Sequence, residues 1–141
     1  MYRAQIENIG GSEYYATTKD YSFVLDTEGR GANPVDAMLA SLCGCIGHYV
    51  RNYLREQQID YRFFTVESKA ALAADNSKLS DIDMWIDLKD VVLDKSRGSE
   101  LLAYVERCKV YCTLKGNCHI TLFLGRDGGK DIRPLEKVAL G

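Results

Sequence analysis

The sequence is poor in several residue types that mark particular classes of protein. Its 141 residues include only two prolines and two histidines, and its apolar runs are far shorter than a membrane-spanning helix. The 18 lysines and arginines nearly balance the 20 aspartates and glutamates. No surplus of positive charge therefore indicates a nucleic-acid-binding protein. We expect no nucleic-acid partner and no membrane partner.

What the sequence does contain is typical of a globular protein. Apolar residues make up 46% and charged residues 27%, and the length suits a single domain over residues 1–141. The five cysteines are an odd number, and the amino terminus lacks the apolar segment of a secretory signal. Both features argue against a disulfide framework and favour a reducing compartment, so we predict a cytoplasmic location.

The hydrophobic pattern predicts an α+β fold with mainly antiparallel strands around a long central helix. Asn33-Pro34 is a typical helix start, and the helical pattern runs to about Gln58, with a kink expected between Gly44 and Gly47. A second helix is expected from an Asp94 cap to about Tyr111. Short strands are expected at 2–9, 13–26 (with a turn at 19–20), 61–73, 80–91 and 118–124, the third and fourth of these forming a hairpin.

The carboxy-terminal segment, residues 125–141, reads as a polar tail with little pattern. Its apolar residues 138–140 are expected either to dock on a partner or to fray.

The cysteines carry the most informative chemistry. Cys43 and Cys45 lie two residues apart on the predicted central helix, so their side chains point to different sides. Each would need a partner elsewhere in the chain. The candidates are Cys108, Cys112 and Cys118, and any one of these cysteines alone reads most simply as a small buried apolar residue.

Two segments resemble the signature of the OsmC/Ohr family. Residues 31–45 contain an Asn-Pro helix start, a stretch rich in leucine and alanine, and a cysteine, Cys45, eleven residues after Pro34. The family's second cysteine follows a helix and is usually followed by proline. Residues 105–112 are similar to that context, and Cys112 is taken as the counterpart, although Thr113 follows it. The order of predicted elements over residues 2–124 is similar as well.

The resemblance implies a fold, a partner and an activity. Members are intertwined homodimers that reduce organic hydroperoxides with a pair of thiols. Cys45 would be the peroxidatic cysteine and Cys112 the resolving one. A small-molecule hydroperoxide would be the substrate and an external dithiol the reductant, with no cofactor.

The residues that would activate the thiol depart from the family pattern. Active members carry a glutamate directly after the helix-starting proline, paired with an arginine. Here Val35 takes that place, and Asp36 lies one residue later, about 100° around the helix. Arg30, in the loop before the helix, is the candidate arginine.

Two other interpretations stay open. Cys45 and His48, together with Cys108, Cys112 and His119, could form a zinc site, but the spacings are not those of a zinc module and we expect no metal. The alternative function is a non-enzymatic OsmC-fold protein that binds a small molecule or a stress-related partner and has structural cysteines. Activation of the Cys45 thiol separates this alternative from the peroxidase.

Overall fold

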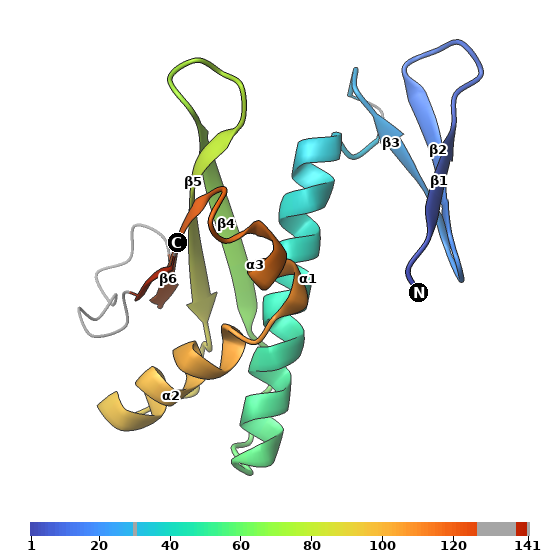
Figure 1. The fold of residues 1–141 in the computed structure, drawn as a ribbon. Helices are drawn as coiled ribbons and strands as arrows, with labels where there is room; N and C mark the ends of the chain where they lie inside the picture. Colours follow the sequence, from blue (N-terminus) through green and yellow to red (C-terminus); the bar gives the residue numbers. More distant parts are fainter. Residues whose placement is uncertain (30, 127–137, 141) are drawn as a thin grey trace. The chain divides into compact units, whose positions relative to one another are not determined.

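The structure is a computed structural model that describes residues 1–29, 31–126 and 138–140. It divides into two compact units, Met1–Ala40 and Ser41–Gly141, which are described separately here. Figure 1 shows the elements of both. The expectation that the two units form a single domain stays a prediction.

The first unit contains a three-stranded antiparallel sheet in the order β1-β2-β3. The predicted strand at 13–26 is two strands, and the expected turn between them is closed where the Thr18 side chain donates a hydrogen bond to the carbonyl oxygen of Tyr21 (3.1 Å). The strands are β1 (Ala4–Glu7), β2 (Glu13–Thr18) and β3 (Ser22–Asp26).

One face of this first sheet is apolar and largely uncovered. Ile6, Ala16 and Phe23 are paired across the three strands, so their side chains project from the same face. Ala16 is buried, but Ile6 is 54% exposed and Phe23 45% exposed. Tyr14 and Leu25 are paired on this face too and are only half-buried. A face of this composition is normally covered by another apolar surface.

Helix α1 (Pro34–Glu56) begins where the sequence predicts it. The Asn33 side chain accepts a hydrogen bond from the Val35 N–H (2.9 Å), and its carbonyl accepts one from Ala37 (2.8 Å). The helix has no break over its 23 residues, so the segment between Gly44 and Gly47 stays helical, and a kink there stays a prediction. Its buried stripe consists of Leu42, Ile46, Val50, Tyr53 and Leu54.

The second unit contains a four-stranded sheet in the order β4-β5-β6-β7. β4 and β5 form the predicted antiparallel hairpin, whereas β5 and β6 are parallel and β6 and β7 antiparallel. A parallel neighbour requires a long crossover connection, which here contains two helices. The strands are β4 (Thr65–Leu72), β5 (Leu79–Asp87), β6 (His119–Leu124) and β7 (Val138–Leu140).

Strand β7 changes the interpretation of the polar tail. Residues 138–140 pair with β6 of the same chain, from Leu122↔Val138 to Ile120↔Leu140. They contribute an edge strand rather than fraying. Residues 127–137 and 141 of the expected tail lie outside the described part of the chain.

The core of the second unit lies between this sheet and the helices. Ile82, Met84 and Ile86 alternate along β5 and are fully buried, as the pattern predicts. The opposite face of β5 is the one expected to be solvated, and Asp81 is exposed there. Trp85 is the exception on that face, because it is buried and stacks on Phe123 with ring centroids 5.4 Å apart.

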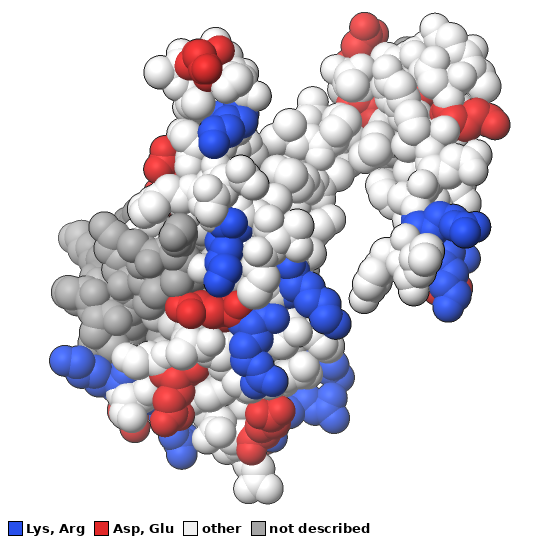
Figure 2. Space-filling model, viewed as in Figure 1, with Lys and Arg blue, Asp and Glu red and all other residues white. Residues whose placement is uncertain are grey.

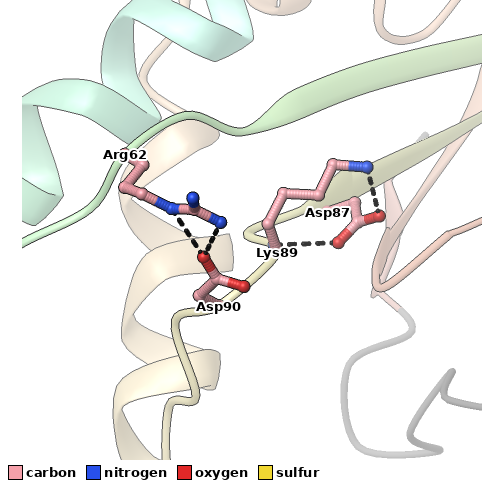
Figure 3. A network of polar contacts seen from close by, with 4 residues as sticks. All are labelled: Arg62, Asp87, Lys89 and Asp90. Atoms are coloured by element: carbon pink, nitrogen blue, oxygen red, sulfur yellow. Dashed lines mark hydrogen bonds and ion pairs between the residues drawn. The ribbon is translucent and has the colours of Figure 1, made fainter.

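Polar contacts fix the loop that follows β5 (Figure 3). Lys89 has a φ of +58°, and both its N–H and its ammonium donate to the Asp87 carboxylate, each at 2.9 Å. Arg62 donates to the Asp90 carboxylate through two nitrogens. Arg62 and Asp90 are both exposed, so this ion pair contributes little to stability.

The predicted second helix is in fact two helices. α2 (Lys95–Val105) begins at the expected cap, where the Asp94 side chain accepts a hydrogen bond from the Arg97 N–H (2.8 Å). The chain leaves the helix after Val105, and α3 (Lys109–Leu114) begins with Cys108 as its cap in an extended conformation (φ −57°, ψ 128°). Residues 105–109 contain no glycine or proline, so the sequence gives no local signal for this break.

Candidate active site

Helix α1 holds Cys43 and Cys45 on different sides, as their spacing predicts. The Cys43 thiol is half-buried and is hydrogen-bonded to the Ser68 hydroxyl on β4 (3.3 Å). Burial, more than the nearby charge of Glu67, raises the pKa of this thiol, and the Ser68 contact only partly offsets the rise. Cys43 therefore faces the sheet as a protonated packing residue.

The Cys45 side chain interacts with a different thiol, that of Cys108. Cys108 is fully buried, and burial first, then a side-chain hydrogen bond with Cys45, raise the pKa of its thiol to about 12. A hydrogen bond that raises the pKa is one in which the protonated thiol acts as the donor. Cys108 thus keeps its proton at neutral pH and interacts with the half-buried Cys45.

The start of α3 fixes the position of the Cys108 sulfur. This sulfur accepts a hydrogen bond from the Tyr111 N–H (3.3 Å), which acts to lower the pKa but does not offset the effect of burial. Tyr111 itself is buried, and burial followed by the negative charge of Glu106 raises the pKa of its phenol to about 12. The result is a pair of neighbouring thiols, the half-buried Cys45 from α1 and the fully buried Cys108 from the cap of α3.

Cys112 occupies a different environment from the one expected of a resolving cysteine. It is exposed, and its thiol donates a hydrogen bond to the carbonyl oxygen of Glu106 (3.2 Å). The thiol that the structure brings together with Cys45 is Cys108, one helical turn earlier. The physical reason is the break after α2, which turns the cap residue inward and leaves the next turn facing outward.

The sequence contains a signal for Cys108 that the assignment of Cys112 as the family's second cysteine does not use. The family's second cysteine is usually followed by proline, and proline favours the first position of a helix. Lys109 is the first residue of α3, so the residue that matches the cysteine of a Cys-Pro pair is Cys108. Four residues later, Cys112 lies inside the helix.

Among the described residues, no contact links the candidate activating residue Asp36 to these sulfurs. Asp36 is exposed in the first turn of α1, nine residues before Cys45. Arg30 lies outside the described residues. Val35, in place of the family glutamate, is 45% exposed.

The remaining cysteine and histidine side chains of the described residues make separate contacts with other partners. The Cys118 thiol donates to the Leu79 carbonyl (3.4 Å), and His48 shares a hydrogen bond with Asn52 (3.2 Å). The His119 ring lies 3.7 Å from the Asp81 carboxylate. Within residues 1–29, 31–126 and 138–140, no group of three or more histidine, cysteine or acidic residues could hold a metal ion.

None of the described helices is both long enough and apolar enough to cross a membrane.

Comparisons with known proteins place the chain in a family. The family model described as OsmC-like protein matches residues 27–123. No curated protein matches the sequence.

Solved structures resemble it at low identity. A putative osmotic stress induced and detoxification response protein from Psychrobacter arcticus has a TM-score of 0.76 and 18% identity, with 86% of this chain and 93% of that chain covered. An OsmC like protein from Mycoplasma pneumoniae has a TM-score of 0.75 and 16% identity, with coverage of 89% and 98%. The organic hydroperoxide resistance protein OhrB of Bacillus subtilis has a TM-score of 0.64 and 19% identity, with coverage of 88% and 97%. The matched family model covers more than half of the sequence, and the chain therefore belongs to the OsmC-like protein family.

Proposed function

We propose that this protein is a thiol-dependent peroxidase that reduces organic hydroperoxides, with Cys45 as the peroxidatic cysteine and Cys108 as the resolving one. The observation that carries the proposal is that a half-buried thiol, Cys45, interacts in the second unit with a fully buried one, Cys108. Related structures from Bacillus subtilis and Legionella pneumophila are named organic hydroperoxide resistance proteins, which supports the choice of substrate class.

The chemistry assigns a separate role to each sulfur. The Cys45 thiolate attacks one oxygen of the hydroperoxide, the O–O bond breaks, and an alcohol leaves after taking up a proton. Cys45 becomes a sulfenic acid, which condenses with the Cys108 thiol to give a disulfide and water. An external dithiol then reduces this disulfide by two exchange steps. The cycle needs no bound cofactor.

The difference in burial favours Cys45 as the first nucleophile. Cys45 is half-buried and so within reach of a small molecule, whereas Cys108 is fully buried and holds its proton. Only a thiolate attacks a peroxide effectively. Cys108 is instead placed to meet the sulfenic acid before a second peroxide does.

An uncharged substrate suits the surface. Figure 2 shows acidic and basic side chains of the described residues lying side by side on the face in view, and the net charge is only −2. Charge-based attraction of a ligand is therefore weak. Because the cycle ends with reduction by a dithiol, we place the protein in the reducing environment of the cytoplasm.

We also propose that the protein is a homodimer. The apolar face around Ile6 and Phe23 belongs to a unit of about 40 residues, a size at which an isolated core is marginal. A second copy of the chain would cover it.

Phe23→Glu should lower the mass measured by light scattering from dimer to monomer, while Tyr21→Glu, in the turn before β3, should leave it unchanged. Identical masses for the wild type and Phe23→Glu would refute this role of the face.

Peroxide consumption with dithiothreitol as the reductant tests the thiol pair. Cys45→Ser should remove turnover of cumene hydroperoxide. Cys108→Ser should allow a first reaction but then lose activity within a few turnovers, as Cys45 is oxidised to the sulfinic acid. Cys43→Ser is the matched control from the same helix and should keep wild-type turnover. Full turnover in Cys45→Ser would refute the proposal and favour a binding protein with structural cysteines.

A further inference from the structure

Three cysteines at or next to the start of α3 differ in their solvent exposure. Cys108 is fully buried, Cys45 is half-buried, and Cys112 is exposed. A disulfide between the first two would place one of its sulfurs out of reach of an external reductant. The exposed thiol of Cys112 lies one turn away from that buried sulfur.

A backbone hydrogen bond links Cys108 and Cys112 across the first turn of α3. The Cys112 N–H donates to the carbonyl oxygen of Cys108 (2.9 Å). Residues four apart on a regular helix have Cβ atoms about 5–6 Å apart, whereas a disulfide needs about 3.5–4.5 Å. Because Cys108 is a non-helical cap, a disulfide with Cys112 needs this first turn of a six-residue helix to rearrange.

The Cys112 side chain already points toward this end of the helix. Its thiol contacts the carbonyl oxygen of Glu106 (3.2 Å), in the connection that carries Cys108. The Cys108 sulfur lies over the same first turn, because it accepts the N–H of Tyr111. Both sulfurs therefore lie at the amino-terminal end of α3.

We propose that Cys112 is an exit thiol, which takes the disulfide from the Cys45–Cys108 pair and presents it at the surface as a Cys108–Cys112 disulfide. This role rests on the proposed peroxidase function. It adds a third cysteine to the cycle and gives the exposed Cys112 a step after resolution rather than resolution itself.

The exchange is balanced in atoms and electrons. The Cys112 thiolate attacks the Cys108 sulfur, a Cys108–Cys112 bond forms, and Cys45 leaves as a thiolate, with no net oxidation. The external dithiol then attacks the exposed Cys112 sulfur, and Cys108 leaves and takes up a proton. The second thiol of the reductant displaces Cys112 and closes the oxidised reductant. Cys45 is free for the next peroxide after the first of these steps.

Chemical oxidation tests the pairing independently of peroxidase activity. Diamide converts dithiols into disulfides and is itself reduced, so no hydroperoxide is needed. Trypsin cleaves after Arg107, Lys109 and Lys115, which separates Cys108 from Cys112 into different peptides. Mass spectrometry should find both the Cys45–Cys108 and the Cys108–Cys112 link in the wild type, and the second link in Cys45→Ser. Absence of the Cys108–Cys112 link from Cys45→Ser would overturn the proposal.

The rate of re-reduction tests the function of Cys112. Diamide-oxidised Cys112→Ser and Cys112→Ala should each be reduced by dithiothreitol at least about fivefold more slowly than the wild type, because the remaining disulfide is less accessible. Cys118→Ser is the matched control and should stay within about twofold of the wild type. Equal rates in the wild type and both Cys112 variants would overturn the proposal.

The two proposals can fail separately. A wild type that forms both disulfides with diamide but does not consume cumene hydroperoxide would refute the peroxidase and leave the exit thiol supported. A wild type that consumes hydroperoxide at a rate unaffected by loss of Cys112, with only the Cys45–Cys108 link detected, would refute the exit thiol alone.

Discussion

Alkaline pH should destabilise the reduced protein in a way that depends on Cys108. Burial and the Cys45 contact raise the pKa of this thiol from 9.0 to about 12. A thiol that holds its proton in the folded state but loses it in the unfolded state favours unfolding as the pH rises. The stabilisation is thus complete below pH 9 and is lost progressively between pH 9 and about pH 12.

The size of the effect follows from proton linkage. Between pH 8 and pH 10 the unfolded thiol changes from roughly one-tenth to nine-tenths ionised, while the folded thiol stays protonated. The free energy of unfolding should fall by roughly 1–2 kcal/mol from this group alone. The buried phenols of Tyr53 and Tyr111, whose pKa values burial also raises to about 12, should together add less than about 1 kcal/mol by pH 10.

Urea unfolding at pH 8, 9 and 10, with a phosphine reductant to keep the thiols reduced, measures this loss. Cys108→Ala will be less stable at every pH because it leaves a small cavity, so the relevant quantity is its pH dependence. The variant should lose roughly 1–2 kcal/mol less than the wild type between pH 8 and pH 10. Parallel stability curves for the two proteins would show that Cys108 ionises normally in the fold, and the assignment of its proton donation to Cys45 would be wrong.

Three further predictions concern packing, capping and acid. Leu102→Ala, at a fully buried position, should lower the free energy of unfolding by about 2–5 kcal/mol, and Val92→Ala, at an exposed one, should change it by less than about 0.5 kcal/mol in urea titrations. Asp94→Ala should cost about 1 kcal/mol because it removes the cap of α2, and Asp94→Asn should restore most of it. Burial opposes ionisation of Asp87, but hydrogen bonds from Lys89 outweigh it and lower the pKa of the carboxyl below 3.8. Its stabilisation is present above that pH and lost as the pH falls through the folded pKa, so Asp87→Asn should flatten the acid limb of a pH–stability curve.

Local signals in the sequence account for the elements that were predicted well. Asn33-Pro34 marks the start of α1, because a side-chain acceptor and a residue without an N–H both suit the first turn. The strict alternation along β5 predicts its buried face, and Asp94 predicts the start of α2. Each of these signals acts over a few residues and needs no knowledge of the rest of the fold.

The elements that were missed depend on distant contacts. Residues 138–140 form β7 only because β6 offers them an edge, and three residues carry too little pattern to indicate a strand. The parallel pairing of β5 with β6 likewise depends on a crossover of two helices rather than on either strand alone. Gly44 and Gly47 each weaken a helix, yet α1 continues through both. A Cβ at Gly47 would lie 3.6 Å from Phe64, which is ordinary packing distance.

The break between α2 and α3 decides the chemistry of the site. On one continuous helix, Cys108 and Cys112 would share a face and have similar exposure. The extended conformation at Cys108 instead buries its sulfur beside Cys45 and leaves Cys112 in solvent one turn later. A periodicity argument does not distinguish the two cysteines, whereas the break leaves Cys108 buried and Cys112 exposed, and the proposed roles rest on that difference. For this reason Cys108→Ser and Cys112→Ser should differ in kind: the first should lead to over-oxidation of Cys45, and the second should slow only the return to the reduced state.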